Sequence, residues 1–467
     1  MTRWDHLIVG AGSAGCVLAR RLADTGTMVL LLDAGPGGAE PTAILSSSFF
    51  AAGGEPGRSW PSLLAVRSEA DVPRDYRRGR GIGGSSAINA MVAIDGLPAD
   101  YDRWDLPGWS WADLAEARSR CLIPQMLPAP HELGPVDEAL IAAMSALGHP
   151  LVDDVTSGDT LGVGPIRLTR RGGRRVTSAA AYLNEAVTVR PNSFVARILI
   201  DRKHAVGVEL VDGTQIEAND VILCAGAIHS PAILQRSGID NPAIGQGLAD
   251  HASIPALLTL KPTGQQTSDH QLAIGSAARF SSSIGHNDLQ ILPMNHLGTG
   301  RDGRSLGMVM LGVMDVTSMG RVHIVSDDPL VEPSIEFNML STRDDVLRAS
   351  DGLDVLLDVL ASQAIDSLST AVTLGEHGVG VEAIPTGRDR ADWMRANLGD
   401  YVHASGTCRM GRPDDPYAVV DLNGHVIGYE QLSVVDASII PRIPRANTHI
   451  PVSLMAEHIA RRWISAS

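Results

Sequence analysis

The segment from residue 5 to 36 constrains the fold more than any other, because it predicts a β-strand, a glycine-rich turn, an α-helix and a second strand. An apolar run ends at Gly10, apolar residues at helical spacing follow, and a second apolar run covers residues 28–32. Gly10, Gly12 and Gly15 would let the strand turn sharply, the backbone approach a diphosphate, and the helix pack closely on the strand. The segment therefore predicts a dinucleotide-binding β-α-β unit.

Asp33 ends the second apolar run, eighteen residues after Gly15. A carboxylate at this position can accept hydrogen bonds from a ribose diol. This spacing favours a cofactor with a non-phosphorylated adenosine.

Composition excludes several kinds of partner. The chain has 467 residues, of which 44% are hydrophobic, enough for a large core in two or three domains or one interwoven pair. A net charge of -15 and only two lysines argue against a nucleic acid or an anionic membrane surface as partner. No segment approaches the roughly 20 apolar residues of a transmembrane helix.

Two further features indicate the cellular setting. The first residues lead directly into the first strand without the pattern of a signal peptide. The four cysteines are far apart and form neither a CxxC pair nor a disulfide framework. We therefore expect a reduced, cytoplasmic setting.

Two more segments predict ligand contacts. Residues 77–91, RRGRGIGGSSAINAM, could wrap a phosphate or an aromatic ring with backbone N–H groups, although a flexible surface loop is an open alternative. Two β-like runs within 194–210 and a third at 221–223 precede Ala225 and Gly226. We expect Ser230 and Pro231 to open a helix there, which would bring another helix N-terminus near a ligand.

The region from 254 to about 373 has a different residue pattern from the segments before it. Short alternating runs separated by Gly, Asp and Ser clusters, among them 308–313 and 321–325, predict a meandering antiparallel sheet, and a helix is expected over 344–360. Four methionines of this region are expected in its core rather than in a pocket: Met294, Met308, Met310 and Met314. A basic cluster is expected as a solvated turn rather than an anion site: Arg170, Arg171, Arg174 and Arg175.

Several motifs together resemble one protein family. Residues 79–102 resemble the first signature of the glucose–methanol–choline (GMC) flavoprotein oxidoreductases, and 224–239 resemble the second, with Asp240 where the family prefers glycine. YVHASGTCRMG, 401–411, resembles the segment that carries the family's catalytic histidine. The compact length and the sequence of residues 96–111 resemble short bacterial GMC dehydrogenases, including those associated with mycofactocin, more than long secreted oxidases.

The resemblance implies a fold and a domain division. We expect an α/β FAD-binding Rossmann-like domain interwoven with an α+β substrate domain built on an antiparallel sheet. The FAD-binding domain would comprise residues 1–145, 186–250 and 418–467. The substrate-binding domain would comprise 146–185 and 251–417.

The resemblance also implies site residues. His403 would be the catalytic base and Asn447 the second active-site residue, with His449 in reserve. Ile88 stands where members with covalent FAD carry a histidine, so FAD should be bound noncovalently. No metal site is expected. The residues expected to contact FAD are Gly10, Gly12, Ser13, Ala14, Gly15, Asp33, Ala34, Arg80, Gly83, Gly84, Ser85, Asn89, Ala90, Met91, Val195, Ala225, Gly226, Asp436, Ala437 and Thr448.

The expected reaction follows from the cofactor. No second GxGxxG motif in a strand-to-helix context and no redox cysteine pair is present, so the flavin itself would be the redox group. An alcohol would be oxidised to an aldehyde or ketone by hydride transfer to flavin N5, while His403 takes the hydroxyl proton. The electron acceptor would be oxygen or a quinone-type carrier. Two alternatives are a non-redox lyase of the hydroxynitrile lyase type and a flavin-binding module without turnover.

Overall fold

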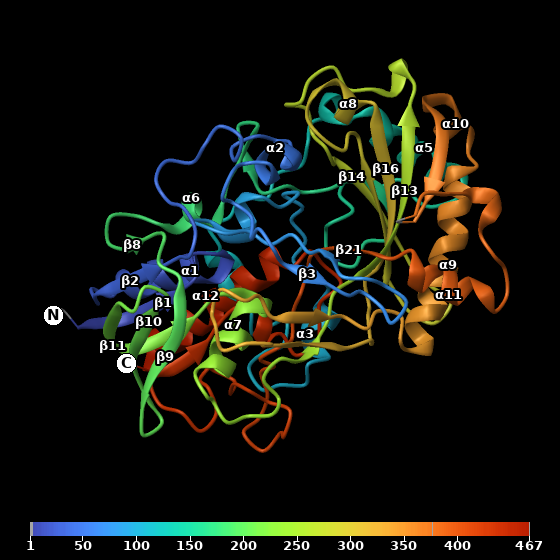
Figure 1. Ribbon diagram of the computed structural model, residues 1–467. Coiled ribbons are helices and arrows are strands. Elements are labelled where there is room, and N and C mark those ends of the chain that lie inside the picture. Colours follow the sequence, from blue (N-terminus) through green and yellow to red (C-terminus); the bar gives the residue numbers. More distant parts are fainter. Residues whose placement is uncertain (1–2, 376, 467) are drawn as a thin grey trace.

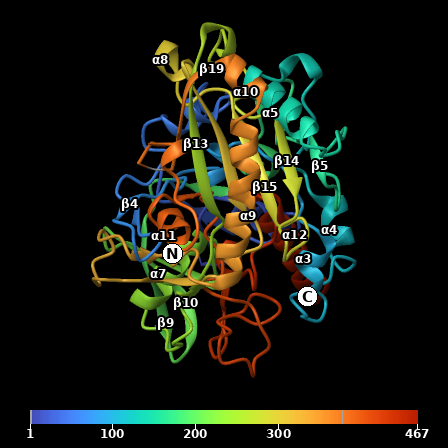
Figure 2. The same ribbon diagram turned by 90° about the vertical axis from the view of Figure 1, so that its right-hand side faces the viewer.

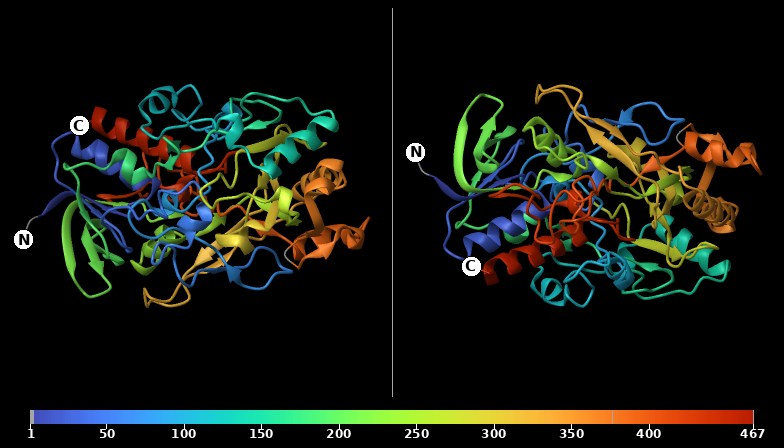
Figure 3. Two further views of the ribbon diagram at one scale, coloured as in Figure 1. Left: turned by 90° about the horizontal axis from the view of Figure 1, so that it is seen from above. Right: turned by 90° about the horizontal axis from the view of Figure 1, so that it is seen from below.

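The computed structural model describes residues 3–375 and 377–466 and contains two large sheets side by side. Figure 1 shows one sheet near the two chain termini and the other at the opposite end, where helices cover its outer face. Views along the perpendicular axis show the same division (Figure 3). None of the described helices is long and apolar enough to cross a membrane.

The sheet near the termini has a parallel centre and antiparallel strands at one side. Among the described residues its order is β8-β2-β1-β11-β10-β9, with β22 also paired to β11. β8, β2, β1, β11 and β22 run parallel, whereas β9 and β10 are antiparallel. Its strands are β1 (Trp4–Val9), β2 (Val29–Leu32), β8 (Thr188–Arg190), β9 (Val195–Asp201), β10 (His204–Leu210), β11 (Gln215–Leu223) and β22 (Leu432–Val434).

The predicted β-α-β unit is confirmed at the centre of this sheet. β1 and β2 pair in parallel, and helix α1 (Ser13–Ala23) connects them. Gly10 turns the chain at a φ of +105°, a conformation that strongly favours glycine. A Cβ on Gly15 would lie 1.9 Å from the carbonyl oxygen of Gly10, so the helix can approach the strand only because residue 15 has no side chain.

The second sheet is antiparallel, as expected. Its order among the described residues is β20-β19-β13-β16-β15-β14-β5, with β21 paired to β13. Its strands are β5 (Gly162–Pro165), β13 (Ala252–Leu260), β14 (Ser276–Phe280), β15 (Leu289–Met294), β16 (Leu306–Val313), β19 (Ser369–Leu374), β20 (Val379–Gly380) and β21 (Gly399–Asp400). The predicted fold class is therefore confirmed.

Side chains alternate along β15 and β16, so the two faces of this sheet belong to two different apolar clusters. Leu289 and Leu311 belong to the large core and lie against Gly352 of α9 (Arg343–Leu360). Leu292 and Met310, which pair across the two strands, belong to a second apolar cluster on the other face. Figure 2 shows α9 lying across the outer face.

The antiparallel meander is smaller than predicted, because β17 (Gly320–His323) does not join it. This strand pairs with β12 (Gln246–Leu248) and β18 (Ser334–Glu336) in a separate small sheet. An alternating pattern predicts a strand but carries no information about its partner, since pairing depends on distant segments. Two hairpins complete the strands, β3 (Leu64–Ala65) with β4 (Arg74–Asp75) and β6 (Arg170–Arg171) with β7 (Arg174–Arg175).

The basic cluster differs in part from the predicted solvated turn. Arg171 and Arg174 are exposed at the tip of the β6–β7 hairpin, but Arg170 and Arg175 are buried. Arg170 pairs with Glu132, and each hairpin strand directs one arginine inward because side chains alternate.

The helix after β11 starts earlier than predicted. α7 begins at Gly226, so Ser230 and Pro231 lie inside it rather than at its start. Pro231 lacks an N–H, and the carbonyl of Ala227, one turn earlier, accepts a hydrogen bond from the Thr407 hydroxyl instead. At the other end α7 is followed by Gly238, which takes a positive φ; Asp240 does not, so this turn needs no glycine at residue 240.

The helices cover both sheets. α1 and α12 pack against each other beside the parallel strands, while α5, α9 and α10 pack around the antiparallel sheet. The domain boundaries stay a prediction, and α5, at the proposed boundary near 145, lies against β14 and β5. The remaining helices are α2 (Phe49–Gly53), α3 (Pro98–Asp102), α4 (Ala115–Arg120), α5 (Pro135–Ala146), α6 (Ser178–Tyr182), α7 (Gly226–Arg236), α8 (Gly300–Arg304), α10 (Gln363–Leu368), α11 (Asp389–Ala396) and α12 (His449–Ala466).

Candidate active site

A cavity of about 450 Å³ lies between the two sheets. Its wall includes the turn after β1, the start of α7 and the start of α12 on one side, and β15 and β16 on the other. The carboxyl ends of parallel strands and the N-termini of the helices that follow them are a usual place for a dinucleotide.

Most of the predicted site residues meet in this cavity. His403, Asn447 and His449 line it, as do seventeen of the twenty residues expected to contact FAD. Gly15, Gly83 and Met91 are not in its wall. Gly15 lies at the helix–strand contact described above, Gly83 donates its N–H to the carbonyl of Ala11, and Met91 is buried in the second apolar cluster.

The glycine turn leaves a cradle of the kind that a diphosphate requires. A Cβ on Gly12 would meet nothing within 4 Å, and the same holds for Gly226 at the start of α7. Gly84 of the first signature approaches so closely that its Cβ would lie 2.7 Å from the Cα of Gly12. The open space beside Gly12 faces the cavity, so the residues present fit a dinucleotide.

Asp33 holds three loops together. Its carboxylate accepts backbone N–H groups of Ala11 at 2.9 Å, Gly35 at 2.9 Å and Gly81 at 2.8 Å. The three donors belong to the glycine turn, the segment after β2 and the first signature. The sequence offered no sign of this structural role, and contact with a ribose stays a prediction.

Asp436 performs a similar task where β22 ends. Its carboxylate accepts the N–H of Gly226 at 2.8 Å, the Ser230 hydroxyl at 2.6 Å and the N–H of Ser438 at 2.7 Å. The second signature and the C-terminal segment are therefore joined at the cavity wall. Burial raises the pKa of Asp436, and the hydrogen bonds from Ser230 and Ser438 oppose that shift.

Arg175, one of the two buried arginines of the basic cluster, positions Asn89. It donates to the Asn89 side-chain oxygen at 2.6 Å and to the carbonyls of Ile44 and Ser86. The same Asn89 oxygen accepts the N–H of Met91. Burial lowers the pKa of Arg175 to about 9.

His403 lines the cavity, and contacts hold its backbone N–H and both of its ring nitrogens. Its N–H donates to Asp250 at 3.0 Å, its Nδ1 lies 3.0 Å from Nδ1 of His251, and its Nε2 lies 3.3 Å from Nδ2 of Asn447. Nε2 of His251 lies 3.1 Å from the carbonyl oxygen of Pro444.

This chain of contacts fixes the tautomer of His403. A carbonyl oxygen can only accept, so Nε2 of His251 carries a hydrogen atom and, in the neutral ring, Nδ1 of His251 is an acceptor. Nδ1 of His403 must then be the donor, which leaves the lone pair on Nε2. The amide of Asn447 donates to that lone pair, so the contact on the opposite side of the ring requires the same tautomer.

Both histidines are neutral at neutral pH. Burial lowers the pKa of His251 to about 4. Burial, and next the neighbouring His251 and Arg78, lower the pKa of His403 well below its ordinary value. Asp250, His251 and His403 offer ligand atoms within 4.8 Å of one another, and both ring nitrogens of His251 take part in the contacts described above.

His449 lines the cavity and contacts the glycine turn. Its Nδ1 lies 2.8 Å from the Ser13 hydroxyl beside the glycine turn, and burial lowers its pKa to about 4. Nε2 of His449 and Oδ1 of Asn447 are buried without a hydrogen-bond partner among the described residues. These two atoms are the kind of orphaned polar group that a bound cofactor or substrate satisfies.

Several residues of the site were not predicted. His251 lies in the GQGLADHAS segment, where the resemblance gave it no role. Met294 and Met310 line the cavity, so the prediction of core positions is wrong for these two; Met314 is buried and Met308 is half-buried. The pairing of β15 with β16 decides which alternate residues face the cavity, and no local pattern gives that pairing.

A nucleotide-type cradle that opens towards a neutral histidine with an unprotonated ring nitrogen defines a class of redox enzyme that uses a bound dinucleotide. Family models for GMC oxidoreductases match residues 4–253 and 316–456. The chain therefore belongs to the GMC oxidoreductase family and is an FAD-dependent enzyme that oxidises CH–OH groups.

Known relatives cover the whole chain. A 5-(hydroxymethyl)furfural oxidase from Methylovorus sp. (strain MP688) is 32% identical, with 98% of each chain covered. The mitochondrial choline dehydrogenase of Homo sapiens is 31% identical over 98% of this chain and 89% of its own. The crystal structure of a pyridoxine 4-oxidase from Mesorbium loti is similar with a TM-score of 0.88 and 28% identity, covering 99% of each chain.

Proposed function

We propose that His403 is the base and Asn447 the hydrogen-bond donor in the oxidation of an alcohol to an aldehyde or ketone. The observation that carries this proposal is the set of contacts around the His403 ring: Nδ1 faces Nδ1 of His251, and Nε2 lies 3.3 Å from Nδ2 of Asn447 in the cavity wall. When bound, FAD would supply the acceptor for the hydride that leaves the alcohol carbon.

His403 and Asn447 have different roles at the substrate oxygen. Nε2 of His403 takes the hydroxyl proton, and Nδ1–H keeps donating to His251, so the resulting imidazolium stays oriented. The Asn447 amide donates to the oxygen as negative charge develops there. The proton cannot pass beyond His251, because its Nε2 faces a carbonyl that is not basic. It therefore leaves through the cavity.

Noncovalent FAD is the second part of the proposal. The residues that would hold it are the lining members of the predicted set, from the glycine turn, the first signature, α7 and the segment around Asp436. Ile88 lines the cavity and offers no atom that could bond to the flavin. Purified protein should release intact FAD on denaturation.

The electron acceptor and the location complete the proposal. We propose oxygen or a quinone-type carrier as acceptor, which reoxidation of the reduced protein with each would distinguish. A cytoplasmic location is supported by four cysteines that are free in the structure.

Anaerobic flavin bleaching tests the reaction. An alcohol substrate should bleach the holoenzyme, and His403→Ala should slow bleaching by about 10²–10⁴-fold while FAD occupancy stays near normal. Asn447→Ala should slow it less, because the base remains. Unchanged bleaching in His403→Ala would remove the histidine from the mechanism, whereas a lyase or a binding module would show no bleaching by alcohols in the parent.

The pH dependence of the same rate gives a second check. His403 accepts a proton only above its own pKa, so activity is lost as pH falls through that value. Because burial places this pKa well below its ordinary range, bleaching should still be fast at the ordinary histidine pKa of about 6.5 and decline only at lower pH. A rate that is already half-lost at that ordinary value would contradict the proposed environment of His403.

A further inference from the structure

We infer that this site takes an uncharged alcohol whose carbinol carbon carries an apolar, ring-sized group, and that it rejects a quaternary ammonium alcohol. The inference rests on the proposed function and names the substrate class of the same site. It distinguishes this chain from its choline dehydrogenase relatives.

The wall beyond His403 is apolar because of strand alternation. Leu292 and Met310 pair across β15 and β16 and line the cavity, and Met294 lies one pleat further along β15. Ile274 and Phe49 extend this wall from other segments. Four of these five residues are aliphatic or thioether side chains, so the surface offers dispersion contacts and no strong hydrogen-bond donor or acceptor.

This apolar wall is continuous with the reacting groups. Leu292, Met310 and Tyr401 belong to one cluster of buried apolar residues, with Phe49 and Met294 packed against it. The Tyr401 ring lies 5.5 Å from the His403 ring between centroids. A substrate with its hydroxyl at His403 therefore places its neighbouring group against these side chains.

The acidic groups in the cavity wall are already engaged. Among the described lining residues they are Asp33, Asp400 and Asp436. Backbone N–H groups and a hydroxyl surround Asp33 and Asp436 as described above, and Asp400 pairs with Arg67. A desolvated ammonium would need a carboxylate or an aromatic cage in contact with it.

The cations of the wall make a positive substrate still less favourable. Arg77, Arg78 and Arg80 line the cavity, and Arg78 is close enough to lower the pKa of His403.

Polyhydroxylated substrates are disfavoured for another reason, since hydroxyls against Leu292, Met294 and Met310 would lose their hydrogen bonds to water without replacement.

A substrate panel tests the inference. With benzyl alcohol, choline and glucose as probes, anaerobic bleaching should give a rate constant divided by Kd at least about 100-fold higher for benzyl alcohol. Choline or glucose as the best of the three would overturn the inference and leave the proposed function intact.

Equilibrium binding separates the two proposals, because it needs no turnover. Benzaldehyde should perturb the visible spectrum of the oxidised holoenzyme, and tetramethylammonium ion should not. Tighter binding of the cation overturns the inference even if no alcohol bleaches the flavin. Bleaching by no alcohol, with benzaldehyde bound, would instead count against the proposed function alone.

A matched pair of variants tests whether the apolar wall is responsible for the substrate preference. Met310→Glu should lower the benzyl alcohol preference over choline by at least about tenfold, because it adds a carboxylate to the apolar surface. Met310→Leu keeps volume and polarity and should keep the preference. An equal preference in both variants would show that this wall does not select the substrate, and the panel still decides if Met310→Glu does not fold.

Discussion

At the scale of single residues, the state of His403 is set by its neighbours and not by its own chemistry. An isolated imidazole has two tautomers, and either nitrogen can carry the proton. Here the Pro444 carbonyl fixes His251, and His251 fixes His403. The proposed base thus has its tautomer set before the substrate arrives, and we propose that His251 is a positioning residue.

Replacing His251 tests this positioning role. His251→Phe removes the acceptor for Nδ1–H and should slow flavin reduction by up to about 10²-fold, less than His403→Ala, with little change in FAD occupancy. His251→Asn can still accept from His403 through its side-chain oxygen and should recover much of the rate. Equal loss in both variants would mean that His251 only fills space.

At the scale of elements, two glycines near the turn between β1 and α1 have different surroundings, so we expect one to matter for folding and the other for binding. Gly15 lies where a Cβ would meet the backbone of Gly10 at 1.9 Å, and Gly12 lies where a Cβ would enter empty space. Gly12 also has an ordinary φ of -86°, so a side chain there adds no backbone strain. Gly15 is needed by the fold, and we expect Gly12 to be needed by the ligand.

These two positions should respond differently to a methyl group or a larger side chain. Gly12→Val should fold, with an apo Tm close to that of the parent, and bind FAD weakly or not at all. Gly15→Ala should lower the apo Tm, because helix and strand must separate. Flavin content and thermal unfolding of the apoproteins measure both effects; normal FAD content in Gly12→Val would contradict the predicted diphosphate position.

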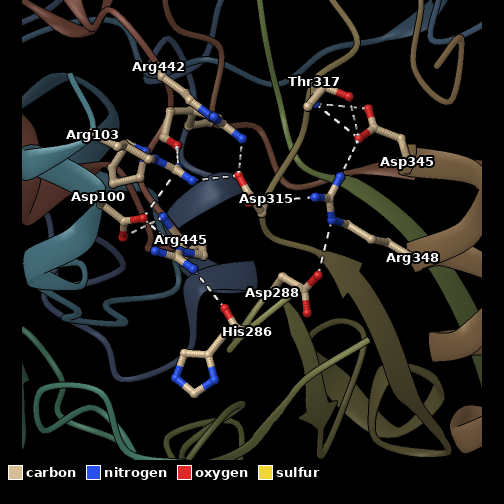
Figure 4. A network of polar contacts seen from close by, with 12 residues as sticks. Asp100, Arg103, His286, Asp288, Asp315, Thr317, Asp345, Arg348, Arg442 and Arg445 are labelled. Carbon is tan, nitrogen blue, oxygen red and sulfur yellow. Dashed lines mark hydrogen bonds and ion pairs between the residues drawn. The ribbon is translucent and has the colours of Figure 1, made fainter. Parts of the chain in front are cut away.

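At the scale of the whole molecule, a buried ion network connects the antiparallel sheet with the segment that leads to Asn447. Asp315, just after β16, pairs with Arg103 at 2.7 Å and with Arg442 at 2.8 Å, and lies 3.8 Å from Arg348 of α9 (Figure 4). Arg445, two residues before Asn447, pairs with Asp100 at 2.7 Å. The network places Asn447 and the Pro444 carbonyl relative to the sheet that carries the apolar wall.

Asp315 is the group whose removal best tests this network. Burial acts to raise its pKa, but Arg103, Arg442 and Arg348 outweigh burial and hold the pKa below its ordinary value. Asp315→Asn leaves three arginines without their shared carboxylate and should cost about 3–5 kcal/mol of unfolding free energy at neutral pH. Denaturant unfolding measures this loss.

The pH dependence of that loss follows from the sign of the shift. A carboxyl with a lowered pKa stabilises the fold above the ordinary Asp value of about 3.9, and this contribution disappears as pH falls through the folded pKa. The difference between parent and Asp315→Asn should therefore shrink in strong acid. The exposed Asp414→Asn is the matched control, and an equal cost at both positions would contradict the role of Asp315.

The sequence alone determined the β-α-β unit, the two-sheet fold class and twenty of the residues that line the cavity, because glycine spacing and family motifs are local patterns with strict geometric requirements. It could not determine contacts between residues that are far apart in the chain and meet only in the folded protein. The tautomer of His403 depends on Pro444 and His251, which come from segments far apart in the chain. The faces of Met294 and Met310 depend on the register of β15 with β16. Only the tertiary structure decides such contacts, since strand pairing and buried hydrogen bonds join residues whose local sequences carry no sign of one another.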